Sequence, residues 1–185
     1  KIPAERWQDL YFAPDFKKFI QTSYGESKSN GLIEKDPRLI IPFYTKDGML
    51  THIQGRALKD NKLRYITIKL KEDFPKIFGL DRVNFGSTVY IVEGPIDSMF
   101  LENSIAAGGS DLRSITNLIK DSVYVFDNEP WNKQICTSLL RLVEDGRKVF
   151  IWPSTMTIKD INDAVIENID IQSVIRENTF SGLEA

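Results

Sequence analysis

The segment Thr88-Val89-Tyr90-Ile91-Val92-Glu93-Gly94-Pro95 decides the fold class of this chain. Residues 88–92 form a continuous apolar and β-branched run, which is typical of a strand that is covered on both faces. Pro95 then opens a helical pattern over 95–103, at a position where its missing N–H group costs nothing. A buried strand that leads directly into a helix is the unit of a parallel sheet, so the segment predicts an α/β fold.

The same alternation of strand and helix continues toward the C-terminus. We expect strands at 105–107, 123–126 and 148–152, and helices at 111–120, 131–144, 160–168 and 170–177. The pattern predicts a Rossmann-like domain with a four-stranded parallel sheet over 87–168, followed by a C-terminal helix and tail over 169–185.

The N-terminal part has a different pattern. An amphipathic helix is expected near 14–22 and an exposed polar loop near 22–31. Strands are expected at 38–44, 49–57 and 63–68, and Lys46-Asp47-Gly48 between the first two is a hairpin signal. Residues 1–86 therefore predict a small α+β subdomain with an antiparallel sheet.

Composition limits the function classes. The chain has 185 residues, of which 42% are hydrophobic and 27% charged, and no apolar run approaches the length of a membrane helix, so we expect no membrane partner. A single cysteine excludes an internal disulfide, which suits a reducing cytoplasm. One cysteine and one histidine are also too few ligands for a structural zinc site. An active site would have to use mainly carboxylates, lysine, arginine and hydroxyl groups.

Charge is distributed unevenly along the chain. Residues 1–86 hold 16 basic and 11 acidic residues, whereas residues 87–185 hold 8 basic and 15 acidic residues. This asymmetry favours a polyanionic partner on one part and cation binding on the other, although two differently charged solvated surfaces would give the same counts.

Acidic residues follow the expected parallel strands. Glu93 follows the strand at 88–92, Asp127 and Glu129 follow the strand at 123–126, and Asp160 follows the last strand. The carboxyl ends of parallel strands share one edge, so these oxygen ligands should gather there and favour Mg²⁺ or Mn²⁺. A single carboxylate could instead stabilise a helix N-terminus, and for Asp97 that alternative stays open.

Basic residues in the N-terminal part offer contacts for phosphates. Arg56 ends a strand in Gln54-Gly55-Arg56, and Lys76 precedes the acidic domain. The alternative is a sheet edge that charge protects from aggregation. His52 is expected to be a packed or surface residue, and Cys136, Trp131 and Trp152 are expected to be core residues.

Two acidic motifs resemble the Toprim domain of primases, topoisomerases and some nucleases. They are Val89-Tyr90-Ile91-Val92-Glu93-Gly94-Pro95-Ile96-Asp97 and Val125-Phe126-Asp127-Asn128-Glu129. Further segments resemble the DNA primases of T-even-type tailed phages: 38–42, 54–58, 65–67, 76–79, 159–163 and 181–185. The resemblance spans nearly the whole chain.

This resemblance implies a DNA primase core that makes short RNA primers on single-stranded DNA during phage replication. It implies Glu93 as the catalytic acid or base, Asp127 and Glu129 as the metal-binding pair, and Asp97 as an acidic position of the same motif. It further implies a third acidic cluster at Asp160 and Asp163, and nucleotide or template contacts at Arg38, Arg56, Lys76 and Lys159.

The implied partners are ribonucleoside triphosphates, the template, the RNA primer and a replicative helicase in the cytoplasm of a bacterial host. The sequence departs from the family at Glu129, where an aspartate is usual, and it cannot contain the zinc-binding module, which is typical of a core cut from a longer protein. A Toprim nuclease and a non-catalytic helicase-binding or DNA-binding module are the alternatives.

Overall fold

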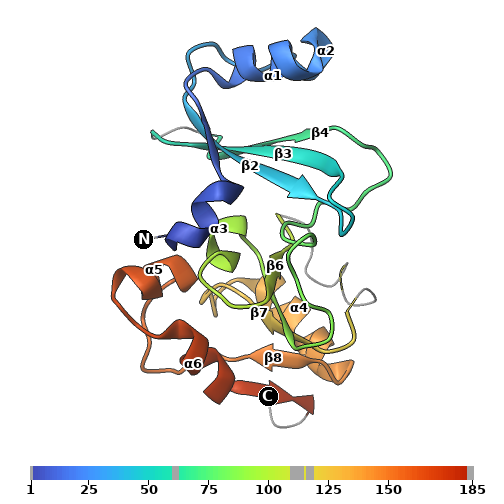
Figure 1. Cartoon of the computed structure of the whole chain (residues 1–185). Helices are drawn as coiled ribbons and strands as arrows, with labels where there is room; N and C mark the ends of the chain where they lie inside the picture. The colour runs from blue at the N-terminus through green and yellow to red at the C-terminus, as the bar shows by residue number, and fades with distance from the viewer. Residues whose placement is uncertain (1, 60–62, 109–114, 116–118, 183–185) are drawn as a thin grey trace. The chain divides into compact units, whose positions relative to one another are not determined.

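The computed structural model describes residues 2–59, 63–108, 115 and 119–182 (Figure 1). The chain divides into two compact units, Ala4–Lys76 and Ile77–Ala185, the latter together with Lys1–Pro3. We call them the basic unit and the acidic unit. The functional boundaries expected at 86/87 and 168/169 stay predictions.

The basic unit is built on an antiparallel sheet, as the sequence predicted. Its strand order is β1-β2-β3-β4, with β1 (Tyr11–Ala13), β2 (Arg38–Tyr44), β3 (Leu50–Ala57) and β4 (Tyr65–Lys69). The short strand β1 and the 3-10 helix η1 (Ala4–Asp9) were not foreseen. A short run of alternating residues carries too little periodicity to be recognised in the sequence.

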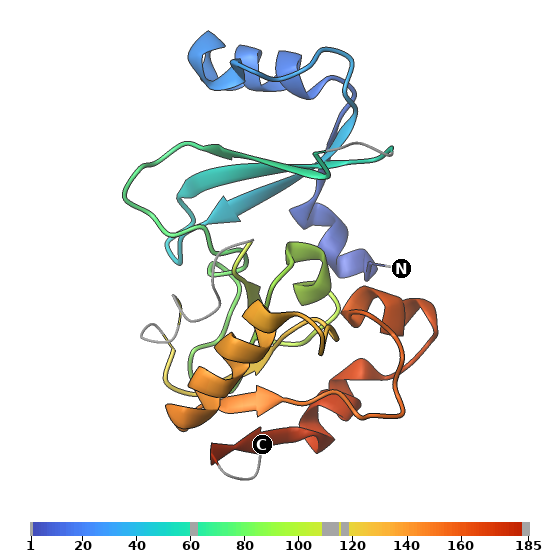
Figure 2. The same cartoon turned by 180° about the vertical axis from the view of Figure 1, so that it is seen from behind.

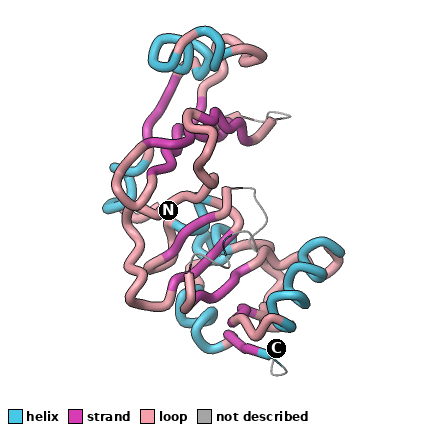
Figure 3. The backbone as a smooth tube through the Cα atoms, turned by 90° about the vertical axis from the view of Figure 1, so that its right-hand side faces the viewer, coloured by secondary structure: helices cyan, strands magenta, loops and turns pink. Residues whose placement is uncertain are grey.

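One helix supplies much of the core of the basic unit. Helix α1 (Phe16–Tyr24) begins at Asp15, whose side chain accepts a hydrogen bond from the Lys18 amide at 3.0 Å. Phe16 and Ile20 lie one turn apart and are buried against Ile40 and Ile53 of the sheet. A short helix, α2 (Glu26–Ser29), occupies part of the predicted loop, and Figure 3 shows it beside α1.

The acidic unit contains a five-stranded, mostly parallel sheet. Its order is β6-β5-β7-β8-β9, with β5 (Val89–Val92), β6 (Ser104–Ala106), β7 (Ser122–Val125), β8 (Lys148–Phe150) and β9 (Thr179–Ser181). The first four are parallel, as expected, and β9 adds an antiparallel edge strand that the sequence pattern did not reveal. The observed fold is thus mixed α/β.

Helices pack on both faces of this sheet. The crossovers from β5 to β6 and from β7 to β8 run in opposite directions, so right-handed connections place α3 (Pro95–Ser98) and α4 (Lys133–Glu144) on opposite faces. Helix α4 lies in front of the sheet in Figure 2. Helices α5 (Ile161–Ile166) and α6 (Ile171–Glu177) complete the unit. The helix expected at 95–103 has only one turn, and most of the one expected at 111–120 lies outside the described residues.

The core of the acidic unit fixes the strand ends. Val89, Ile91, Tyr124 and Val149 from the three central strands are fully buried. The pairing of Val92 with Val125 brings β5 and β7 to an end at the same level of the sheet. Glu93 and Asp127 therefore emerge at one edge. In the described part of the chain, no helix is long and apolar enough to cross a membrane.

Candidate active site

The carboxylates at the end of β5 and β7 lie next to each other. Glu93 directly follows β5, and Asp127 follows β7 after Phe126. The Asp127 amide donates a hydrogen bond to Glu93 Oε1 at 3.3 Å, which ties the two strand ends together. Both side chains are partly buried. This pair forms the centre of the candidate site.

Asp127 is the most strongly perturbed acid of the site. Burial raises the pKa of its carboxyl to about 7, and the negative charges of Glu93, Asp97 and Asp160 add to the effect, whereas Lys159 opposes it. The negative charges of three other carboxylates therefore act on Asp127. A cation would relieve this repulsion.

Glu93 is perturbed in the same direction. Burial raises the pKa of its carboxyl, and the charge of Glu129 raises it further, while the hydrogen bond from the Asp127 amide and the charge of Lys159 lower it. A carboxyl group with a raised pKa can exchange a proton closer to neutrality than an exposed glutamate can. Glu93 thus has the protonation behaviour of an acid or base.

Glu129 is held by two donors. Lys159 Nζ lies 3.1 Å from Glu129 Oε1, and Asn132 Nδ2 donates to Oε2 at 2.9 Å. Hydrogen bonds from Asn132 and Lys159 lower the pKa of Glu129, so this carboxylate is ionised. The Glu129 amide also donates to the Asp127 carbonyl at 2.8 Å. This bond closes a tight turn just after β7.

Asp97 joins the site from the single turn of α3. Its Oδ1 accepts a hydrogen bond from the Asn162 amide at 3.1 Å, which connects α3 to α5. A Cβ atom at Gly94 would lie only 2.5 Å from Asp97 Oδ2. Any larger residue at position 94 would therefore have to displace the Asp97 carboxylate.

Asp160 and Asp163 of the third acidic cluster differ in their contacts. Asp160 precedes α5 and accepts a hydrogen bond from the Asp163 amide at 2.8 Å, so it caps the helix while its charge acts on Asp127. Asp163 lies in the first turn of α5 and is partly buried.

Asparagine residues were missed by the sequence reasoning. Asn128 Nδ2 donates to the carbonyls of Ile158 and Met156, at 2.8 and 3.1 Å, and its amide donates to the Lys159 carbonyl at 2.7 Å. Asn132 caps α4 besides binding Glu129. Its place just before a helical pattern was a usable signal, but Asn128 offered none.

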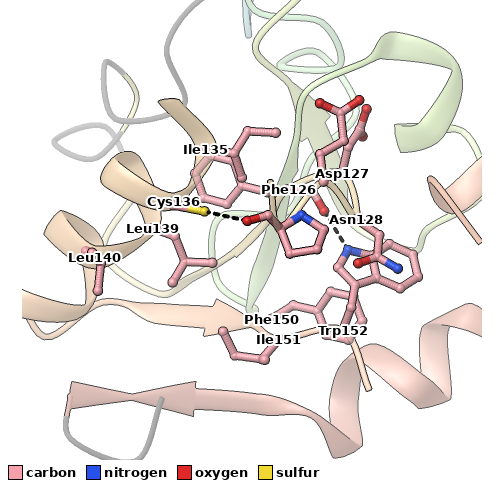
Figure 4. Close-up of a pocket in the computed structure, with 12 residues that line it drawn as sticks. Phe126, Asp127, Asn128, Ile135, Cys136, Leu139, Leu140, Phe150, Ile151 and Trp152 are labelled. Atoms are coloured by element: carbon pink, nitrogen blue, oxygen red, sulfur yellow. Dashed lines mark hydrogen bonds between the residues drawn. The ribbon is translucent and has the colours of Figure 1, made fainter. Parts of the chain in front are cut away.

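A cavity of about 350 Å³ lies beside the turn that carries these acids. Figure 4 shows its mostly apolar walls, which come from α4, β8 and the end of β7. Trp152 Nε1 donates to the Phe126 carbonyl at 2.8 Å, and Trp152 packs edge-on against Phe150 with ring centroids 4.8 Å apart. These contacts support the strand end just before Asp127.

The oxygen donors fit a hard divalent cation by their chemistry. In the described residues, no three or more His, Cys, Asp or Glu side chains are arranged to hold a metal ion by themselves. Mg²⁺, however, often binds through one or two carboxylates, with water and substrate phosphates as further ligands. The crowding of negative charge around Asp127 suits that mode of binding.

Arg38 requires a correction to its expected role. Its side chain is fully buried, with an ion pair to Asp36 at 2.7 Å and hydrogen bonds to the Gly55 and Leu63 carbonyls. A guanidinium enclosed in this way holds the sheet together and leaves no surface for a nucleotide. The expected contact with nucleotide or template followed from the resemblance to primases, and arginine is rarely fully buried in this way.

Two further basic candidates, Arg56 and Lys76, also belong to the basic unit. Arg56 is partly exposed, and its guanidinium lies 5.8 Å from the ring centroid of Tyr65, as does that of Arg64. Lys76 is partly buried, and burial lowers the pKa of its ammonium group. Lys159, in contrast, lies within the acidic site itself.

The expected packing residues have mixed outcomes. His52 is buried in β3 beside Thr51, with ring nitrogen Nδ1 3.1 Å from the hydroxyl oxygen. Cys136 is partly buried, and its thiol donates to the Pro130 carbonyl. Trp131 was expected in the core but is 76% exposed.

Comparisons with known proteins identify the type of fold. No family model matches the chain. The chain is 36% identical to the DNA primase of Enterobacteria phage T4 over 191 residues, which cover 100% of this chain and 55% of that protein.

Two solved primase structures share the fold at low sequence identity. The Aquifex aeolicus primase, with its zinc-binding and RNA polymerase domains, has a TM-score of 0.70 at 17% identity, over 97% of this chain and 54% of that one. The DnaG primase catalytic domain bound to single-stranded DNA has a TM-score of 0.69 at 13% identity, over 95% of this chain and 68% of that one.

The chain therefore has the fold of a primase catalytic core, with the acids of its motifs at one edge of the sheet. In sequence it is related to phage T4 DNA primase along its whole length, and it spans about half the length of that protein. These findings confirm the relationship to DNA primases that the motifs predicted.

Proposed function

We propose that the chain is the catalytic core of a DNA primase, a nucleotidyltransferase that makes short RNA primers on single-stranded DNA for phage DNA replication. The observation that carries the proposal is the hydrogen-bonded contact between Glu93 and Asp127 at the shared edge of a mostly parallel sheet, where the charges of Asp97 and Asp160 also act on Asp127. The relationship to T4 DNA primase supports this reaction. A Toprim unit over 87–168 is part of the proposal.

The proposed cofactor is Mg²⁺ or Mn²⁺, held by Asp127 and Glu129 with Asp97 nearby. When bound, it supplies positive charge to the triphosphate and to the attacking hydroxyl. The chain's own contribution is a preorganised set of charges, because Asn132 and Lys159 fix the Glu129 carboxylate and the Glu93 side chain is fixed by the Asp127 amide.

Glu93 is proposed as the general base. The 3′-hydroxyl of one ribonucleotide attacks the α-phosphorus of the next triphosphate, a P–O bond forms, and the bond to pyrophosphate breaks. The hydroxyl proton passes to the Glu93 carboxylate, whose pKa is raised by burial and is therefore better matched to a reaction near neutral pH.

Cations of the chain have proposed roles in binding phosphates. Lys159 is about half exposed next to Glu129, where it could bind a triphosphate oxygen. Arg56, beside the partly exposed Tyr65 ring, and Lys76 are proposed contacts for nucleotide or template. A replicative helicase as partner and the host cytoplasm as location complete the proposal, following the relationship to a phage primase.

The test is a single incubation with three distinguishable outcomes. The chain is mixed with Mg²⁺ or Mn²⁺, end-labelled single-stranded DNA and labelled ribonucleotides, alongside Glu93→Gln and the control Glu144→Gln. Glu144 is an exposed glutamate at the end of α4. We expect new short RNA from the wild type and from Glu144→Gln, and at least a roughly 100-fold loss in Glu93→Gln.

The alternatives give different products. Shortened DNA that is lost in Glu93→Gln would identify a Toprim nuclease, which would use the same acids. DNA binding that is equal in all three proteins, with no RNA and no cleavage, would support a non-catalytic module. Either outcome would contradict the primase proposal.

A further inference from the structure

Asn128 connects two segments that each carry part of the acidic site. It stands between Asp127 and Glu129 on the turn after β7, and all three of its hydrogen bonds described above go to the segment 156–159. That segment leads directly into Asp160 and α5. Asn128 therefore connects the two halves of the site directly, beside the ion pair between Lys159 and Glu129.

The side chain has only one arrangement that satisfies these bonds. Both amide hydrogens are used, because Nδ2 donates to the carbonyls of Ile158 and Met156. The backbone bond to Lys159 at 2.7 Å fixes the next carbonyl of the segment. Neither an aspartate nor an aliphatic residue could donate to these carbonyls.

The consequence of this anchoring appears on both sides of Asn128. Lys159 reaches back to Glu129 at 3.1 Å, and the charge of Asp160 acts on Asp127. Each of these two pairs, Lys159 with Glu129 and Asp160 with Asp127, joins the segment after β7 to the segment that Asn128 anchors. A change in the position of the 156–159 segment would separate both pairs together.

We propose that Asn128 is a positioning residue that aligns the segment carrying Lys159 and Asp160 with the carboxylates of Asp127 and Glu129. Asn128 acts through Lys159 and Asp160 and needs no contact with substrate. The inference rests on the proposed function only in one respect, namely that the aligned groups form the active site.

The test uses Asn128→Ala, with Asn178→Ala as its matched control. Asn178 also donates from Nδ2 to a backbone carbonyl, that of Val174 at 2.9 Å, but at the end of α6. Hydrogen exchange of the amides in 156–163 is measured first, together with Mn²⁺ binding by calorimetry. We expect faster exchange in this segment and roughly 10- to 100-fold weaker Mn²⁺ binding in Asn128→Ala only, as for other groups that orient metal ligands.

A double mutant then distinguishes positioning from general destabilisation. Primer synthesis is measured for Asn128→Ala, Lys159→Met and the combination. If Asn128 acts through Lys159, the combined loss is clearly smaller than the product of the two single losses. Multiplicative losses, or unchanged exchange and Mn²⁺ binding, would overturn the inference.

The outcomes also separate this inference from the proposed function. Should the wild type bind Mn²⁺ without making RNA, the exchange and binding results still decide the role of Asn128, while the primase proposal fails. Asn128→Ser is prepared in parallel in case the alanine variant does not fold. Unfolding of both variants would show that the amide serves the fold as a whole, which would also overturn the inference.

Discussion

Replacing Gly94 by alanine should displace the Asp97 carboxylate. The new Cβ atom would lie 2.5 Å from Asp97 Oδ2, whereas ordinary contacts begin near 3.4 Å, so the oxygen has to move by roughly 0.9 Å. The backbone at Gly94, with φ −102° and ψ 138°, suits any residue. In the folded state, the effect of the substitution therefore comes from the side chain of Asp97.

The magnitude follows from the bond that Asp97 must give up. Its Oδ1 accepts from the Asn162 amide at 3.1 Å, and a hydrogen bond to a charged group contributes about 1.5–3 kcal/mol. The lower chain entropy of alanine in the unfolded state returns about 0.4–1 kcal/mol. The net loss of stability is about 1–2 kcal/mol, or a fall in Tm of roughly 2–8 °C for a chain of this size.

Thermal unfolding and ribonucleotide incorporation measure the two effects of Gly94→Ala. Gly86→Ala is the control, since its nearest contact would be an exposed asparagine side chain at 3.2 Å. In an Asp97→Ala background the clash disappears, so Gly94→Ala should no longer destabilise. Equal Tm values for Gly94→Ala and the wild type, or a full destabilisation that persists without the Asp97 carboxylate, would refute this reasoning.

Three further predictions concern single side chains. Arg38→Met should lower the free energy of unfolding of the basic unit by about 3–5 kcal/mol in chemical denaturation, because Asp36 and two backbone carbonyls lose their buried partner. An unchanged stability with weaker DNA binding would instead support a contact between Arg38 and phosphate. Burial, aided by Lys69, lowers the pKa of His52, so the unfolded state binds more protons at this residue and the contribution of His52 to stability is lost as pH drops through about 6.5. The wild type should therefore lose stability relative to His52→Gln between pH 7.5 and 5.5, and a constant difference in stability would contradict this. Lys159→Met should raise the KM for ribonucleotides more than it lowers kcat, and an unchanged KM would contradict its proposed contact with phosphate.

Much of the fold could be predicted because each parallel strand is a continuous apolar run. Such runs require burial on both faces, and the strand at 88–92 was therefore recognisable from residue types alone. The edge strand β9 was missed, since its partner β8 lies about thirty residues away and a three-residue strand has no periodicity. The helix after Pro95 was expected to reach residue 103, because the helical pattern continues past Ser98, where the observed helix ends.

The acidic part of the site could be predicted for a topological reason. Parallel strands end at a shared edge, so Glu93 and Asp127 had to lie close together once the strands were assigned. The contacts of Asn128 depend on the path of the loop at 156–159, and no residue pattern encodes that path. The resemblance implied that Arg38 contacts nucleotide or template, and its burial could not be foreseen because it depends on carbonyl groups from two separate segments, at Gly55 and at Leu63-Arg64.

The most direct test of the central claim is ribonucleotide incorporation by Asp127→Asn beside Asp145→Asn. Asparagine keeps the shape of the side chain and removes the carboxyl group on which the charges of Glu93, Asp97 and Asp160 act. Asp145 is an exposed aspartate at the end of α4 and serves as the control. The account predicts template-dependent RNA from the control and at least a roughly 100-fold loss in Asp127→Asn. Undiminished RNA synthesis by Asp127→Asn would contradict it.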